Sequence, residues 1–149
     1  MKKLFLLSFC LILTACVKTV FHQYSPIQKN IWRFADKKQF HVKIDKDGYY
    51  DVSISIRNTD EYEWNNLWLN LQEEKPDGKT EKERFNFKLA DIAGHWLGRG
   101  PGKLHDQSFL VKKDIRLSEG NYIFSLQHDM RENNLRGIAE VGMQVIRVK

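Results

Sequence analysis

Residues 49–57 read Tyr-Tyr-Asp-Val-Ser-Ile-Ser-Ile-Arg, and this stretch decides the fold class. Apolar and polar side chains alternate along it. That two-residue period is typical of a strand with one face on the core and the other in water. The face expected to be buried carries Tyr50, Val52, Ile54 and Ile56. The stretch therefore predicts a half-buried strand.

The same period recurs along most of the chain. The apolar positions of these further runs are Phe40, Val42 and Ile44; Leu67, Leu69 and Leu71; Phe85, Phe87 and Leu89; Tyr122, Phe124 and Leu126; and Val141, Met143 and Val145. Phe109 and Val111 start another run, which we expect to continue past a bulge to Ile115 and Leu117. Gly142 is a second position where a bulge is expected, because glycine inside a strand often marks one.

Turn signals separate the runs. They lie at residues 45–48, 76–79 and 118–121, and all contain glycine beside aspartate, asparagine or proline. No segment keeps a 3.6-residue apolar period over three turns, and residues 89–94 are expected to form one helical turn at most. The sequence predicts an all-β fold, a single antiparallel β-sandwich of jelly-roll or immunoglobulin-like type with about 7–9 strands.

The composition fits one globular domain and excludes several classes of protein. With 149 residues, 42% of them hydrophobic, the chain can bury a core without disulfides. Its formal charge of +5 is mild, so we expect no nucleic-acid partner. Two cysteines are too few for a disulfide scaffold or the usual cysteine-based zinc site. We expect no cofactor.

The start of the chain is typical of an export signal. Two lysines precede the apolar residues 4–13, a run too short to span a membrane. Residues 13–16, Leu-Thr-Ala-Cys, resemble the bacterial lipobox, whose cysteine is acylated and becomes the first residue after cleavage. The alternative is an ordinary signal peptide with an incidental cysteine. We predict a signal peptide at 1–15, an acylated tether at 16–28 and the sandwich at 29–149.

Acylation of Cys16 would attach the protein to a membrane, because two or more acyl chains bind stably where one binds only marginally. Val17 is not an acidic retention residue, and residues 18–20 carry no acidic cluster typical of export to the cell surface. These residues favour the outer membrane and its periplasmic face.

We find no pattern that indicates catalysis. The histidines His22, His41, His95, His105 and His128 lie far apart and lack the spacing of metal ligands. A Gly-x-Ser-x-Gly nucleophile motif is missing from the sequence. Residues 45–48 begin like a calcium loop but lack its later ligands, so a tight turn is the better interpretation. The sequence predicts a protein that is not an enzyme and binds no metal.

Two polar segments remain as candidate sites. Residues 94–103 hold the densest glycine cluster. They form either a structural loop, in which glycine permits close backbone approach, or a binding loop that presents Trp96 with nearby cations. Residues 127–132 follow an apolar run and include Arg131, which is either solvated or paired with Asp91.

Motifs in a fixed order cover nearly all of the chain after the lipobox. They are Trp32 and Phe34; residues 57–59 with Tyr62; residues 65–69, 76–78 and 89–100; and residues 120–124, 130–131 and 137–142. Together they resemble the gliding motility lipoprotein GldH family of the Bacteroidetes. One departure is Glu83-Arg84, which stands where the family tends to carry an Asp-Thr pair.

The resemblance implies a non-enzymatic lipoprotein of the cell envelope that is required for gliding motility and linked with type IX secretion. Its partners would be the membrane, through acyl chains on Cys16, and other envelope proteins of that machinery. The residues that we expect to contact a partner or to define the fold are Asp91, Gly94, Trp96, Gly98, Gly100, Met130 and Arg131.

Two other functions stay open at this point. A carbohydrate-binding sandwich would stack sugars on exposed aromatic residues, for which Tyr62, Trp68 and Trp96 are the candidates. Trp68 supports this idea, because it points away from the apolar face of its strand. A hydrolase would need two carboxyl groups brought together by the fold, and the sequence singles out no such pair.

Overall fold

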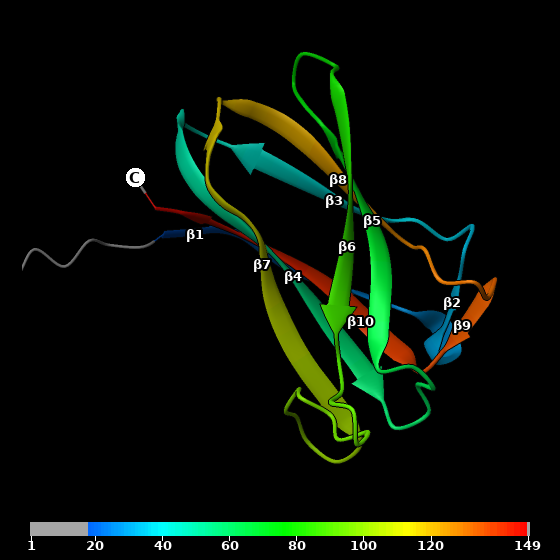
Figure 1. Ribbon diagram of the computed structural model, residues 1–149. Helices are drawn as coiled ribbons and strands as arrows, with labels where there is room; N and C mark the ends of the chain where they lie inside the picture. Colours follow the sequence, from blue (N-terminus) through cyan, green and yellow to red (C-terminus); the bar gives the residue numbers. More distant parts are fainter. Residues whose placement is uncertain (1–17, 149) are drawn as a thin grey trace, which may run out of the picture.

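The computed structural model describes residues 18–148 (Figure 1). The predicted signal peptide and Cys16 lie outside the described residues. The strands are β1 (Lys18–Pro26), β2 (Ile31–Arg33), β3 (Lys38–Ile44), β4 (Gly48–Thr59), β5 (Asn66–Glu74), β6 (Thr80–Lys88), β7 (Leu104–Leu117), β8 (Gly120–His128), β9 (Asn134–Arg136) and β10 (Ile138–Arg147). A 3-10 turn, η1 (Gln28–Asn30), precedes β2. Among residues 18–148 no helix is long and apolar enough to cross a membrane.

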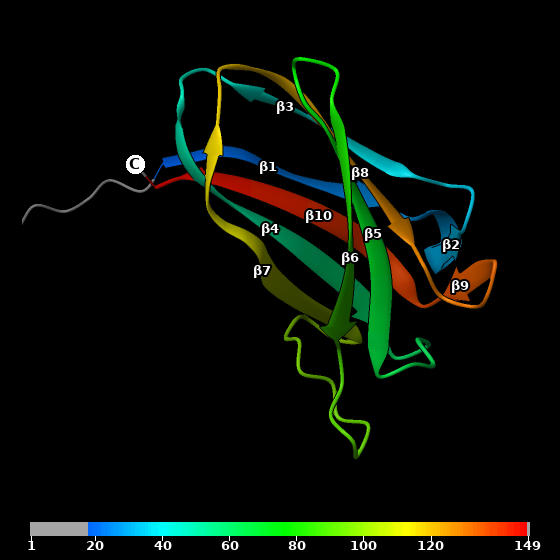
Figure 2. The ribbon, with the colours of Figure 1, turned by 45° about the horizontal axis from the view of Figure 1, so that its top comes forward.

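Two four-stranded antiparallel sheets pack face to face, in the strand orders β1-β10-β4-β7 and β3-β8-β5-β6 (Figure 2). The predicted all-β antiparallel sandwich is confirmed. The two sheets hold eight strands, within the predicted range. The short pair β2–β9, with three residues in each strand, brings the described total to ten.

The strand pairing is nested from the ends of the chain towards its middle. β1 pairs with β10, β2 with β9, β3 with β8, β4 with β7, and β5 with β6. The chain is therefore one long hairpin with its tip at residues 75–79. It is folded over so that β10 also pairs with β4 and β8 with β5. This arrangement is a jelly roll, which decides between the two sandwich types left open by the sequence.

The core consists largely of the alternating positions expected from the sequence. Tyr50, Val52, Ile54 and Ile56 are all buried on β4. The other predicted apolar runs supply most of the remaining core, except that Phe85, Phe109, Val111 and Ile115 are only partly buried. Burying one large apolar side chain contributes about 1.5–3 kcal/mol, so this alternation is the main source of stability.

The predicted bulge on β7 is confirmed, whereas the one at Gly142 is wrong. The β4–β7 register shifts on both sides of Val52, and Asp114 takes a left-handed φ of 53°. Gly142 instead pairs in register with both neighbouring strands. A Cβ added there would lie 2.8 Å from Cδ1 of Tyr24, so this glycine makes room for an aromatic ring. At residues 89–94, where we expected one helical turn at most, the Gly94 N–H donates to the Asp91 carbonyl in a tight turn, and Ala90 forms a β-bridge with Trp96.

Residues 18–28, which we expected in the tether, are part of the folded domain. β1 is an edge strand paired with β10, and its Tyr24 ring lies 3.8 Å below the Arg57 guanidinium. The same guanidinium bonds to Asp106 on β7 and Glu140 on β10, and the Asp106 bond raises the pKa of Arg57. The sequence hid this strand because a register shift between Thr19 and Phe21 interrupts the alternation.

Candidate functional site

The two ends of the sandwich differ in character. The near end carries the start of β1 and the turns at 45–47, 75–79 and 118–119, because the antiparallel register aligns them. The far end carries the loops at 60–65, 89–103 and 129–133. Exposed large apolar side chains gather at the far end, namely Phe34, Trp64, Ile92 and Leu97. A binding surface is therefore best sought there.

A groove of about 330 Å³ opens at the far end, on the outer face of β5 and β6. We call it the far-end groove; it is lined by Trp64, Asn66, Trp68, Arg84, Asp129, Met130 and Arg131. The Arg84 guanidinium lies 4.0 Å from the centre of the Trp68 ring, and its Nε donates to Asp129 at 2.6 Å. The ion pair therefore fixes the cation over the aromatic face.

The loop after β8 completes the groove. The backbone N–H of Trp68 donates to Sδ of Met130 at 3.3 Å, and the Asp129 N–H donates to the Trp68 carbonyl at 2.8 Å. These bonds hold the flexible Met130 side chain in place. Trp64 is 41% exposed beside it, and Arg131 is exposed at the rim. The groove thus combines an apolar floor with a free cationic rim.

Of the predicted site residues, the structure brings Met130 and Arg131 to the groove and leaves the others in the 89–103 loop. Of the two alternatives left open for Arg131, the pairing with Asp91 is not found. The Asp91 carboxylate instead accepts the N–H groups of Ala93 and His95, each at 2.9 Å, and contacts the His95 ring. These bonds, led by the His95 N–H, lower the pKa of Asp91. Its charge is therefore used within its own loop.

The geometry of the 89–103 loop fits a structural role. The Trp96 ring stacks on His105, with centroids 5.4 Å apart, and packs against the core. A Cβ added at Gly98 would lie 2.9 Å from the Asp106 carbonyl oxygen, and one at Gly100 would lie 2.5 Å from that of Leu104. Gly94 has a φ of +85°. Each glycine is therefore needed for a turn or a close backbone approach.

The sequence reasoning did not single out Trp64, Arg84 or Asp129, although Asp129 lies in the candidate segment 127–132. A signal for Arg84 was present, because a hairpin with its turn at 76–78 pairs Asn70 with Arg84 and so sets Arg84 diagonal to Trp68. No comparable signal existed for Asp129. Its place depends on the pairing of β8 with β5, which the alternation of the two strands does not specify.

The three aromatic residues proposed for sugar stacking do not form a platform. Tyr62 is 3% exposed, and its hydroxyl donates to the Asn66 carbonyl at 2.8 Å. Trp68 is covered by Arg84, and Trp96 is stacked on His105. Tyr62 was therefore a wrong candidate, because its ring belongs to the core.

Two carboxyl pairs meet in space, and each is bridged by a cation: Asp106 and Glu140 by Arg57, and Glu73 and Glu83 by Lys112. Glu73 and Glu83 each lie 2.7 Å from Nζ of Lys112. Glu73 is 2% exposed, so a substrate cannot reach it. Within residues 18–148, no group of three or more metal-ligating side chains comes together.

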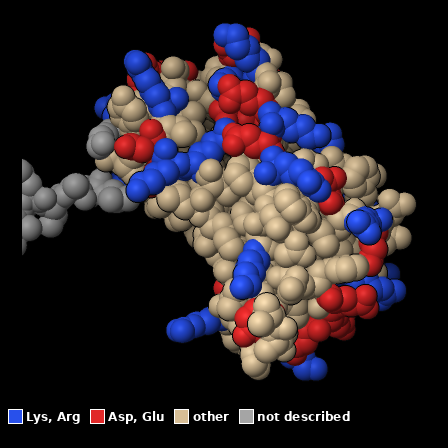
Figure 3. Space-filling model, viewed as in Figure 1, with Lys and Arg blue, Asp and Glu red and all other residues tan. Residues whose placement is uncertain are grey.

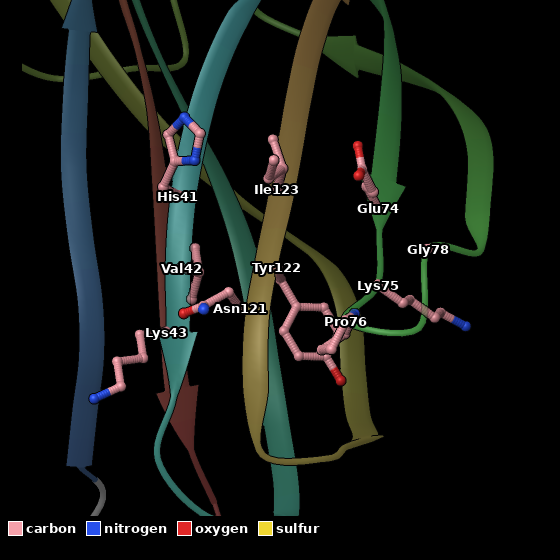
Figure 4. A pocket seen from close by; sticks show the side chains of 10 residues that line it. All are labelled: His41, Val42, Lys43, Glu74, Lys75, Pro76, Gly78, Asn121, Tyr122 and Ile123. Carbon is pink, nitrogen blue, oxygen red and sulfur yellow. The ribbon is translucent and has the colours of Figure 1, made fainter.

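A second cavity of about 570 Å³ lies at the near end and includes His41, Lys43, Glu74, Lys75 and Tyr122 in its lining (Figure 4). Lys43 and Lys75 point away from one another in Figure 4. They pair with Asp45 and Glu81 respectively. The cavity therefore lacks the convergent polar groups expected of a small-molecule site.

Beneath the far end, the ring of His128 is fully buried between Trp32 and Phe34, at centroid distances of 5.5 and 5.7 Å. Neither ring nitrogen has a well-formed hydrogen bond. Desolvation lowers the pKa of His128, and nearby backbone groups of Trp32 and Asn133 offset only part of this effect.

We expect His128 to make stability fall on mild acidification. Below the ordinary histidine pKa of about 6.5, His128 binds a proton in the unfolded chain but stays neutral in the folded chain. The free energy of unfolding then falls by up to about 1.4 kcal/mol per pH unit, until the lowered folded pKa is passed. Urea unfolding measured at several values between about pH 7 and 5 gives the free energy of unfolding as a function of pH. For His128→Phe this free energy should fall less steeply with decreasing pH than for the wild type. His41→Phe, at an exposed position, is the matched control. Equal slopes for His128→Phe and the wild type would contradict the expectation.

The fold and the far-end groove define a small jelly-roll domain with a groove lined by aromatic and basic side chains at one end. Comparison with known proteins gives its relationships. The model of the GldH lipoprotein family matches residues 19–145, so the chain belongs to this family. The predicted resemblance is confirmed.

Two named relatives are gliding motility proteins. The chain is 30% identical over 137 residues to the gliding motility lipoprotein GldH homolog of Christiangramia forsetii, covering 86% of this chain and 83% of that protein. It is 24% identical over 148 residues to the gliding motility lipoprotein GldH of Flavobacterium johnsoniae, covering 94% and 92%. Among solved structures, the Eiger TNF of S. frugiperda superposes with a TM-score of 0.42 at 11% identity, covering 73% of this chain and 64% of that one.

Proposed function

We propose that the chain is a lipid-anchored, non-enzymatic component of the gliding-motility and type IX secretion machinery. In this proposal an acylated Cys16 holds it at the periplasmic face of the outer membrane, and its far end contacts other envelope proteins. The family name supports the link to motility and to lipid attachment. The lipobox at residues 13–16 supports Cys16 as the attachment site.

The observation that carries the contact role is the far-end groove. Tryptophan, arginine and methionine are enriched at protein interfaces, and a few such residues supply most of the binding free energy. Here Trp64 and Met130 form the apolar floor, and Arg131 supplies the charge. Arg84 is already held by Asp129, so the floor would be ordered before a partner arrives.

Complementation of a strain that lacks the protein tests both parts of the proposal. Cys16→Ser should escape signal cleavage, be absent from the outer-membrane fraction and restore neither motility nor secretion. The double variant Trp64→Ser/Arg131→Glu should stay in the membrane fraction yet fail to restore them, because each hot-spot loss removes about 2–4 kcal/mol of binding free energy.

Leu110→Ser serves as the control, since Leu110 is 52% exposed on β7 and lies outside the groove. It should restore motility fully. Normal signal cleavage of Cys16→Ser, with retention of the cleaved protein in the outer-membrane fraction, would refute the anchor. Full rescue by the double variant would refute the groove as the contact surface.

A further inference from the structure

The start of β1 limits how far the folded domain can move from its anchor. Lys18 already pairs with Arg147, and the pairing continues along β1. Because an extended chain spans at most about 3.6 Å per residue, the two-residue step from Cys16 to Lys18 reaches about 7 Å. If Cys16 carries the lipid, the near end lies within about 10 Å of the headgroups, roughly one Debye length.

We propose that the near end of the sandwich rests on the lipid headgroups and that the long axis of the domain points away from the membrane. This inference rests on the proposed acylation of Cys16. The surface seated on the lipid would consist of the start of β1, the end of β10 and the turns at 45–47 and 118–119. The occupant of that surface is the membrane itself.

A second observation supports the lipid contact. Tyr49 is 44% exposed at this end, and its carbonyl accepts the N–H of Val148 at 2.9 Å. The Tyr49 backbone therefore lies beside the end of β10, the strand that pairs with the anchored end of β1. Tyrosine is enriched at membrane–water interfaces, where its apolar body and polar tip meet both phases.

Charge does not drive this orientation. Lys18, Lys46 and Arg116 lie at the near end without an ion pair to residues 18–148. Asp45, Asp47 and Glu119 lie close by, and Figure 3 shows acidic and basic side chains intermixed at the upper left. With Lys43 and Arg147 included, five basic side chains stand against these three acidic ones, an excess of only two charges, so the short covalent link sets the orientation. The lipid contact should therefore be insensitive to salt.

The orientation places the far-end groove away from the membrane. The ten residues of β10 run from one end of the sheet to the other. At about 3.3 Å per residue they span roughly 30 Å. Trp64, Ile92 and Phe34 would then face partners that extend about 30 Å above the lipid surface, rather than partners embedded in it.

Fluorescence quenching in vesicles tests the orientation. The acylated full-length mature protein is predicted to have no free thiol, so a single introduced cysteine can carry a nitrobenzoxadiazole label. Lys46→Cys labels the near end, Ile92→Cys the far end and His22→Cys the side formed by β1. The vesicles contain phosphatidylethanolamine and phosphatidylglycerol with headgroup spin-labelled phosphatidylcholine as the quencher.

We expect strong quenching at position 46, weaker quenching at 22 and none at 92, unchanged by added salt. A flexible Gly-Ser insert of about 20 residues before Lys18, with a mean span of ~25 Å, should reduce the difference between 46 and 92. Quenching strongest at 22 would mean that the domain lies on its side, and equal quenching at 46 and 92 would mean that it tumbles. Either result overturns the inference.

Mass spectrometry of each labelled protein separates the two possible failures. Absence of acyl groups on Cys16 would refute the proposed anchor and, with it, the orientation. Acylated Cys16 with one of the contrary quenching patterns would refute the orientation alone.

Discussion

Replacing Gly137 with alanine is expected to lower the free energy of unfolding by about 3–5 kcal/mol. Gly137 has a φ of +85°, and an added Cβ would lie 2.3 Å from the Tyr62 nitrogen and 2.7 Å from the Glu61 carbonyl carbon. These are backbone atoms, which cannot move aside as a flexible side chain can. Urea unfolding followed by tryptophan fluorescence measures the loss.

Gly137 also joins three segments. Its N–H donates to the Asn30 carbonyl, and its carbonyl accepts the Thr59 N–H, both at 2.8 Å. Gly94→Ala is a matched control, because Gly94 has the same φ of +85° but nothing within 4 Å of the position that the added methyl group would take. That change should cost only the left-handed penalty of about 1–2 kcal/mol. Equal losses for the two variants would show that the contact with Tyr62 is not the cause.

Replacing Lys112 with methionine is expected to destabilise the fold by about 3–5 kcal/mol. Lys112 extends from β7 to Glu73 on β5 and so links the two sheets. Glu73 points into the sandwich at the end of the buried row Leu67, Leu69 and Leu71. Without the ammonium group, its carboxylate would be left buried and unpaired, which is what makes the loss large. Glu83 lies closer to solvent and contributes less.

The double variant Glu73→Met/Lys112→Met removes both charges from the interior. Its stability should return to within about 1–2 kcal/mol of the wild type or exceed it, because replacing a buried ion pair by apolar side chains is often neutral. Lys113→Met, at the exposed neighbouring position, should stay within about 0.5 kcal/mol. Unfolding curves in urea again give the values. A double variant as unstable as Lys112→Met would show that packing, rather than the unpaired carboxylate, causes the loss.

The fold class could be predicted because a two-residue apolar period is a local property, and the long strands keep it. β4 shows this most clearly, from Tyr50 to Ile56. The strands that the sequence analysis did not predict lack a two-residue apolar period for physical reasons. β2 and β9 have three residues each, too few to show a period, and β1 is interrupted by its bulge.

The choice of partner strands was beyond the sequence, because alternation assigns residues to faces and leaves their neighbours unspecified. In the candidate site, too, the direction of a side chain could be predicted from the sequence, whereas its contacts with distant residues could not. The outward direction of Trp68 followed from its place between Leu67 and Leu69. The pairing of Asp91 with Arg131 failed because an aspartate followed by a tight turn is satisfied first by its own backbone.

The nested pairing also has a consequence for how the chain folds during synthesis and export. β10 lies between β1 and β4, so that sheet lacks an inner strand until residues 138–147 have emerged. Only the β5–β6 hairpin can close from local contacts, and every other pairing spans a progressively longer loop. Until then β1 and β4 expose unpaired edges that can pair with other chains. A chain that crosses a membrane with its N-terminus first would thus remain unfolded in transit, and it would fold in one late step after β10 is delivered.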